Sequence, residues 1–197
     1  MVLGLLLLAA ALFLAVQNKE EADQAAQDSA VILNALTHQL QNIEETSIDL
    51  SPVQELWQTP EMSVMEFDGN RYIGILEIPR LGLSLPVAEN WSEEQLKVSP
   101  GRYSGSYYTN DLVICGHNYP HHFAPTKYLE NGDEVYFITA DGVRMGYTVL
   151  ERETVWPTEI EKMIDRGDNM WDLTLFTCNN GGSSRCAVRC IRDESLD

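Results

Sequence analysis

Three side chains, each next to the predicted end of a strand, have the chemistry needed for nucleophilic attack on a carbonyl group. Cys178 follows the mostly apolar run at residues 173–177, and His117 follows the apolar run at residues 113–116. Arg185 begins the next run, after a short loop that contains glycine. Because the two ends of a hairpin loop lie close together, we expect Cys178 and Arg185 to be neighbours on paired strands.

A cysteine needs two kinds of help to attack a peptide carbonyl group. A base or a cation must sustain the thiolate, and a hydrogen-bond donor must stabilise the oxyanion that forms. The imidazole of His117 and the guanidinium of Arg185 can supply these functions. A cysteine or histidine taken alone more often has a packing role, so it is the combination that favours catalysis.

Short β-rich runs separated by turn residues occupy the chain from about residue 71 onward. The pair Asp141-Gly142 is typical of a tight hairpin turn because it accepts positive φ angles. One short helix is expected at residues 158–165. The expected strands are residues 72–78, 83–87, 111–115, 135–139, 144–152, 173–177 and 185–191. Seven or eight short strands with one short helix predict an all-β fold, a closed or nearly closed antiparallel barrel.

An uninterrupted apolar run from Val2 to Val16 predicts that residues 1–18 form a membrane anchor. At about 1.5 Å per residue the run spans roughly 22 Å, somewhat less than the roughly 30 Å hydrocarbon core of a bilayer. A cleaved signal peptide is the alternative, but no Lys or Arg precedes the run and residues 15–17 fit a cleavage site poorly. We expect the native start to lie upstream of Met1.

Strong helix formers follow the apolar run, and Leu33, Leu36, Leu40 and Ile43 recur at helical spacing. They predict an amphipathic stalk, and a helix packed on the surface of the domain is the alternative that the sequence leaves open. Prolines and the absence of a sustained period then indicate a linker. We therefore assign residues 19–69 to a helical stalk and linker, and residues 70–197 to a folded β-domain.

The net charge and the cysteines exclude other classes of protein. The formal charge of -17, from 30 acidic and 13 basic side chains, argues against nucleic acid as a partner because phosphates would be repelled over most faces. The four cysteines are too few and too unevenly spaced for a small disulfide-stapled fold. Cys186 and Cys190, about 13 Å apart in an extended strand, should be unpaired because a disulfide needs roughly half this separation.

Several segments resemble the sortase family in the same order along residues 70–192. Residues 174–178, Thr-Leu-Phe-Thr-Cys, resemble the Thr-Leu-x-Thr-Cys motif of the family. Residues 113–117, Val-Ile-Cys-Gly-His, resemble the strand that ends in its catalytic histidine, and residues 185–189 resemble the strand that opens with its arginine. Further similarity lies at residues 72–87, 100–106 and 129–135.

The resemblance implies an all-β fold, a closed eight-stranded antiparallel barrel with short helices. It also implies a cysteine transpeptidase that cleaves a Leu-Pro-x-Thr-Gly-like sorting signal between Thr and Gly and joins the Thr to an amine. It implies that Cys178 attacks the Thr carbonyl, Arg185 binds the oxyanion and His117 exchanges protons with the two amines. The expected partners are secreted proteins with C-terminal sorting signals and an amine acceptor, either a lipid-linked cell-wall precursor or a pilin lysine. The domain is expected on the outside of the cell membrane, with no cofactor and no metal.

The resemblance also bears on the residues around these three. Cys115, Thr177 and Trp156 are expected to contact substrate, with simple packing as the alternative for Cys115 and Trp156. Arg189 shares a strand face with Arg185, but its position in the motif favours a structural role. The short loop after the cysteine has no room for the longer inserted helix of some class B members, and the lack of an Asp-Pro-aromatic lid motif argues against a lidded class C enzyme. The subclass stays open, class B-like or class D-like.

Three alternatives belong to other functional classes. A structural zinc module could use Cys115, His117, Cys186 and Cys190, although their spacing differs from the usual ligand pairs. A membrane-anchored β-domain with a peptide-binding role and no catalysis is the second. A papain-like hydrolase fits poorly, because such enzymes place the cysteine at the start of a helix and the histidine downstream of it.

Overall fold

The structure is a computed structural model that describes residues 2–46, 61–164, 171–179 and 182–193. Most of the predicted linker, residues 47–60, lies outside the described residues. The elements in chain order are α1 (Val2–Thr46), β1 (Met65–Phe67), β2 (Asn70–Ile78), η1 (Pro79–Leu81), β3 (Leu83–Ala88), α2 (Glu93–Leu96), β4 (Gly101–Ser104), β5 (Leu112–Cys115), η2 (Ala124–Tyr128), β6 (Glu134–Thr139), β7 (Arg144–Val155), η3 (Pro157–Met163), β8 (Leu173–Cys178) and β9 (Arg185–Arg192).

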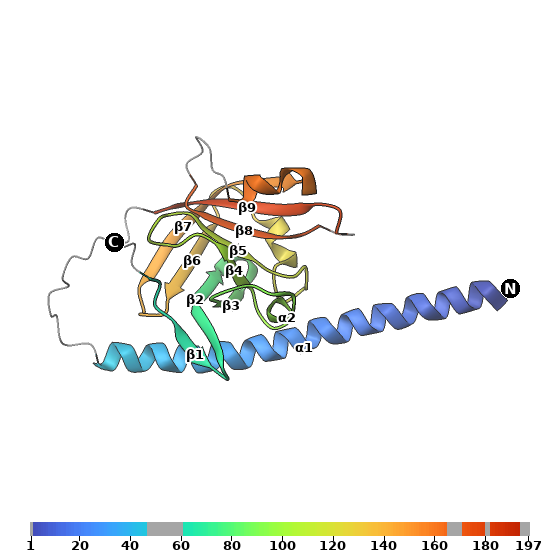
Figure 1. The fold of residues 1–197 in the computed structure, drawn as a ribbon, viewed down its shortest axis with the longest axis horizontal. Helices are drawn as coiled ribbons and strands as arrows, with labels where there is room; N and C mark the ends of the chain where they lie inside the picture. The colour runs from blue at the N-terminus through green and yellow to red at the C-terminus, as the bar shows by residue number, and fades with distance from the viewer. Residues whose placement is uncertain (1, 47–60, 165–170, 180–181, 194–197) are drawn as a thin grey trace.

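Eight of these strands close into a barrel. Their order around the ring is β2-β3-β4-β5-β8-β9-β7-β6, and the ring closes because β6 pairs back onto β2 (Figure 1). The short strand β1 lies outside the ring and pairs with β2 alone. The predicted eight-stranded barrel is therefore confirmed.

The expectation that every strand pair is antiparallel is wrong for two pairs among the described residues. β3 runs parallel to β4, and β5 runs parallel to β8. Parallel neighbours need a long crossover connection, and the chain that includes β6 and β7 makes this connection between β5 and β8. Since a run of buried residues looks the same in both orientations, the local sequence pattern could not reveal the direction of pairing.

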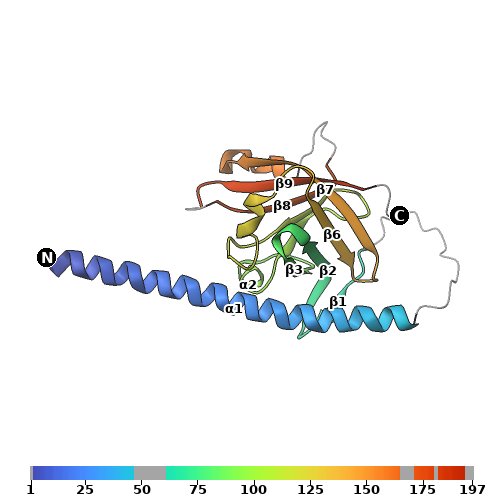
Figure 2. The same ribbon diagram turned by 180° about the vertical axis from the view of Figure 1, so that it is seen from behind.

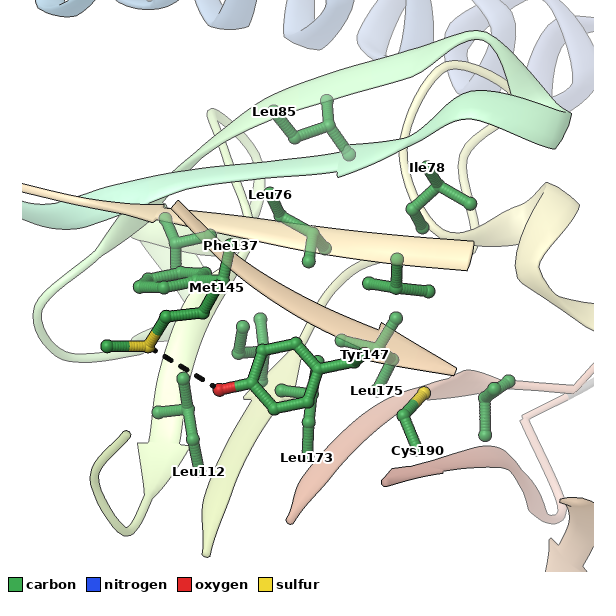
Figure 3. Close-up of a cluster of buried hydrophobic side chains, with 14 of the residues drawn as sticks. Leu76, Ile78, Leu85, Leu112, Phe137, Met145, Tyr147, Leu173, Leu175 and Cys190 are labelled. Atoms are coloured by element: carbon green, nitrogen blue, oxygen red, sulfur yellow. Dashed lines mark hydrogen bonds between the residues drawn. The ribbon is translucent and has the colours of Figure 1, made fainter. Parts of the chain in front are cut away.

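Side chains from the inner faces of the strands fill the barrel. Figure 3 shows this core, in which Tyr147 and Phe137 are fully buried and the Tyr147 hydroxyl donates a hydrogen bond to Sδ of Met145 at 3.8 Å. Burial of each large apolar side chain contributes about 1.5–3 kcal/mol to folding. The core therefore supplies the rigid frame on which the strand ends are fixed.

α1 is a single continuous helix that runs from the apolar segment to the far side of the barrel (Figures 1 and 2). Its side chains are exposed from residue 2 to residue 21, and a buried face begins at Ala22. This face consists of Ala22, Ala25, Ser29, Ile32, Leu36 and Leu40, at helical spacing. The second half of α1 is thus packed on the domain, which decides between the two readings of the stalk.

The exposed first part of α1 is long and apolar enough to cross a membrane, which is consistent with a membrane anchor or a signal sequence. The packed part contacts the barrel beside β1 and β3, where Leu36 lies against a cluster that includes Tyr72 and Ile75. The division of the chain into anchor, stalk and catalytic domain stays a prediction. The second half of α1 and the barrel share one hydrophobic cluster.

Candidate active site

The parallel pairing of β5 and β8 brings the histidine and the cysteine to the same edge of the barrel. In this pairing Cys115 lies opposite Phe176. His117 is two residues beyond Cys115, and Cys178 is two residues beyond Phe176, so both lie at the same level past the paired region. An antiparallel pair would have placed the two side chains at opposite ends of the strands.

The antiparallel hairpin of β8 and β9 supplies the arginine. Cys178 and Arg185 are directly opposite each other in its register, as the sequence predicted. Two hydrogen bonds between Asn179 and Ser184 close the loop that joins them, at 2.9 Å and 2.8 Å. Nη1 of Arg185 donates to the carbonyl oxygen of Gly182 at 3.0 Å, which holds the guanidinium at the mouth of this loop.

Contacts between the ends of β5 and β8 hold the site together. The buried Thr177 hydroxyl donates to the carbonyl oxygen of Gly116 at 2.8 Å, and the Gly116 amide donates to the carbonyl oxygen of Phe176 at 3.1 Å. The ring of Phe123 packs so closely that a Cβ at Gly116 would lie 2.7 Å from it. The backbone before His117 therefore has little freedom to move.

A cavity of about 240 Å³ opens over these strand ends. It brings together Cys178, His117 and Arg185, and the predicted contacts Cys115 and Thr177. The complete lining is Trp91, Glu93, Leu96, Tyr103, Cys115, Gly116, His117, Ile160, Phe176, Thr177, Cys178 and Arg185. Trp156, the third predicted contact, is 53% exposed and does not line the cavity.

Burial shifts the pKa values of two groups in the cavity, His117 and Cys115, in opposite directions. It lowers the pKa of His117, with the Glu93 carboxylate as a smaller opposing influence, so the imidazole is neutral at pH 7 and can accept a proton. Burial also raises the pKa of Cys115 to about 12, which keeps this thiol protonated and a poor nucleophile. Cys178 is half-buried, whereas the other three cysteines are buried.

Arg189 has a structural environment instead. Its side chain is fully buried, and it forms an ion pair with Oε1 of Glu153 at 2.5 Å. Nη1 donates to the Thr174 hydroxyl at 2.8 Å, and the guanidinium carbon lies 4.4 Å from the centroid of the Trp171 ring. All of this holds Arg189 away from the cavity that Arg185 lines.

The sequence did not predict the aromatic wall of the cavity. Trp91 and Tyr103 have ring centroids 5.6 Å apart, and Tyr103 meets Phe176 edge-on at 5.1 Å. Ile160, on the short helix η3, lines the side where Trp156 was expected. Trp91 is surrounded by polar residues in the sequence and gives no periodic signal, and β4, which carries Tyr103, is only 4 residues long.

The zinc alternative finds no support in the geometry of the described residues. No group of three His, Cys, Asp or Glu side chains among them could hold a metal ion. Cys190 lies in the barrel core and Cys115 in a separate cluster beside the cavity.

Comparisons with known proteins cover most of the barrel. A family model described as the Sortase domain matches residues 76–193. Sortase D of Bacillus subtilis (strain 168) is 35% identical over 108 residues, which are 53% of this chain and 53% of that protein. The match therefore spans about half the length of this curated relative.

Solved structures are similar in fold as well. Sortase C1 from Streptococcus suis has a TM-score of 0.53 and 25% identity, covering 64% of this chain and 74% of that chain. Sortase C1 from Streptococcus agalactiae has a TM-score of 0.56 and 25% identity, covering 66% of this chain and 72% of that chain.

Proposed function

Because the chain belongs to the sortase family, we propose that it is a cysteine transpeptidase that cleaves a Leu-Pro-x-Thr-Gly-like sorting signal and joins the new carboxyl end to an amine. The single observation that carries the proposal is that Cys178, His117 and Arg185 line one cavity, although they come from the ends of three different strands. The similarity to Sortase D supports the class D-like alternative over the class B-like one.

In the acylation step, His117 takes the proton of the Cys178 thiol and the sulfur attacks the Thr carbonyl carbon. Arg185 donates hydrogen bonds to the oxyanion. As the C–N bond breaks, the His117 imidazolium gives its proton to the departing glycine amine. A thioester between Cys178 and the signal remains.

In the second step an amine attacks the thioester. Neutral His117 accepts the proton that the amine loses, the C–S bond breaks, and the proton returns to the Cys178 sulfur. The lowered pKa of His117 suits this role, because the base is unprotonated at neutral pH before each attack. The acceptor is a cell-wall precursor amine or a pilin lysine.

The cavity walls suit the acyl side of such a signal. Leu and Pro are apolar, and Trp91, Tyr103, Phe176 and Ile160 give the cavity an apolar surface beside the sulfur. With residues 2–16 as the membrane anchor, the barrel lies on the outer face of the cell membrane. There it meets secreted proteins that carry sorting signals.

The test is cleavage of a fluorogenic Leu-Pro-x-Thr-Gly peptide by the full-length chain in detergent. Cys178→Ala should reduce cleavage by at least about 10³-fold, because Cys115, the other thiol that lines the cavity, is buried and stays protonated. Cys186→Ala, which removes a buried thiol that does not line the cavity, should keep most of the activity. Cleavage by the Cys178→Ala protein at a rate near that of the unmodified chain would contradict the proposal.

A further inference from the structure

A second cavity borders the same cysteine, between α1 and the loop that follows β5. It measures about 660 Å³ and shares His117 and Cys178 with the first cavity. Its complete lining is Asn18, Lys19, Glu21, Ala22, Asp23, His117, Asn118, Tyr119, Pro120, His121 and Cys178. The N-terminal helix is therefore a wall of the reaction site as well as an attachment to the barrel.

The two cavities differ in chemistry. The surface of both cavities is mostly apolar, but the charged side chains differ: the first has Glu93 and Arg185 beside its aromatic rings, whereas the second has Lys19, Glu21 and Asp23 from α1. Arg185 lines only the first cavity. The sulfur and the imidazole thus lie between a compartment that contains Arg185 and aromatic rings and one that contains the carboxylates of α1.

Transpeptidation needs two such compartments. The acyl part of the signal stays on one side of the scissile carbonyl, and the departing and incoming amines occupy the other. Both amines exchange a proton with His117, so they must bind on the side where the imidazole is accessible. The second cavity contains this imidazole and the sulfur but not Arg185, nor the aromatic wall of Trp91, Tyr103 and Phe176 that suits the acyl part.

We propose, on the basis of the proposed function, that the cavity between α1 and residues 117–121 is the binding site of the acceptor amine, and that Glu21 and Asp23 favour an ammonium group there. The shared sulfur and imidazole define the site, and the two carboxylates give it a preference for positive charge. Lys19 also lines the cavity and offsets part of this preference.

The electrostatic influence of α1 on the loop is visible in the loop itself. Burial lowers the pKa of His117, and the Glu21 carboxylate acts in the opposite direction, with a smaller effect than the Glu93 carboxylate and the Lys97 ammonium. Burial raises the pKa of Tyr119, and Glu21 adds to this rise. Tyr119 stacks near His117 with ring centroids 5.0 Å apart. Negative charge on α1 is therefore felt at the group that must receive the proton of the amine.

The first experiment measures the charge preference at the sulfur without any catalysis. The full-length chain reacts with 2-aminoethyl methanethiosulfonate, a cation, and with methyl methanethiosulfonate, which is neutral, and mass spectrometry follows modification of Cys178. In the doubly substituted Glu21→Gln, Asp23→Asn chain, the ratio of cationic to neutral rate should fall about threefold or more. Cys178→Ala gives the background from other thiols.

Glu20→Gln is the matched control. It removes one negative charge from the same turn of α1, where the double variant removes two, but Glu20 does not line the cavity, so the ratio should stay close to that of the unmodified chain. An unchanged ratio in the double variant, or an equal fall with Glu20→Gln, would overturn the proposal.

The second experiment links the site to the acceptor. With a sorting-signal peptide, the concentration of triglycine amide, a cation, that gives half-maximal ligation should be about threefold or more higher for the double variant than for the unmodified chain. The half-maximal concentration of neutral hydroxylamine should stay unchanged. Equal use of both nucleophiles would count against the site. If the unmodified chain ligated no peptide, the proposed function would fail, and the thiosulfonate ratio would still decide whether the cavity selects an amine.

Discussion

Two arginines four residues apart on β9 illustrate how position decides the role of one residue type. Arg185 is half-buried, faces Cys178 across the hairpin and bonds only to carbonyl oxygens of its own loop among the described residues. Arg189 is fully buried and paired with a carboxylate. The first arrangement leaves donors for a substrate, and the second uses them for the fold.

Substitution of each arginine by alanine should therefore have opposite consequences. Arg189→Ala should lower the free energy of unfolding by about 3 kcal/mol, because it leaves the Glu153 carboxylate without its buried partner. Arg185→Ala should change this free energy by less than about 1 kcal/mol but reduce peptide cleavage by about 10²-fold through loss of an oxyanion donor.

Urea unfolding and peptide cleavage, measured on both variants, distinguish these roles. A strong loss of stability in Arg185→Ala with full activity, or the reverse pattern in Arg189→Ala, would show that the assignments are exchanged.

At the scale of elements, the site depends on how the ends of β5 and β8 are locked together. The Thr177 hydroxyl joins the two ends, and Phe123 packs against the backbone of Gly116. His117 follows this locked segment directly. Its position thus depends on a glycine that leaves room for an aromatic ring.

Gly116→Ala should move His117 relative to Cys178. The added Cβ would lie 2.7 Å from the Phe123 ring, so strand or ring must shift, at a cost of about 1–3 kcal/mol in unfolding free energy. Cleavage should fall at least about tenfold, because proton transfer needs close alignment.

A double-mutant cycle with Phe123→Ala checks this explanation. Removal of the ring takes away the clash, so the loss of stability in the double variant should be smaller than the sum of the two single losses. Strictly additive losses would mean that the contact does not limit the position of the loop.

The sequence predicted some of these elements and missed others for physical reasons. The hairpin pairing of Cys178 with Arg185 could be predicted because both residues flank one short loop. The proximity of His117 could come only from the resemblance to a family, because it depends on a parallel pairing between β5 and β8 that no local pattern encodes. β1 and β4 are 3 and 4 residues long, too short for a period of two to appear.

At the scale of the whole molecule, α1 joins the apolar segment, the barrel and the histidine loop. Its packed face begins at Ala22, close to the loop that carries His117 and His122. The sequence predicted a helix there but could not choose between a free stalk and a docked one, since both require the same apolar face. The amine site proposed above exists only in the docked arrangement.

His122 makes the stability of this arrangement sensitive to acid. It is fully buried, and neither ring nitrogen makes a hydrogen bond with the part of the chain that the structure describes. Burial lowers its pKa to about 4 from 6.5, against an opposing effect of a backbone group of Ala25 on α1.

The unfolded chain therefore binds a proton near pH 6.5 that the folded chain binds only near pH 4. Above about pH 6.5, His122 is neutral in both the folded and the unfolded chain and does not lower the free energy of unfolding. As the pH drops to about 4, only the unfolded chain gains the proton, so the free energy of unfolding falls by roughly 3 kcal/mol in total. His122→Phe should remove this contribution and flatten the dependence on pH. Urea unfolding of the unmodified chain and of His122→Phe, each at pH 7 and pH 4.5, measures how much free energy of unfolding each protein loses in acid. An equal loss in the two proteins would contradict the prediction.

If residues 2–16 form a membrane anchor, the unbroken course of α1 also sets the distance between the membrane and the proposed site. With residues 2–16 embedded in the bilayer, a rise of about 1.5 Å per residue leaves the cavity beside Glu21 within roughly 10 Å of the lipid headgroups. The sulfur of Cys178 would then stay at a nearly constant distance from the membrane, because the same continuous helix is embedded at one end and packed on the barrel at the other. Under the proposed function, the sorting signals and amines within reach would be those held at the same membrane surface.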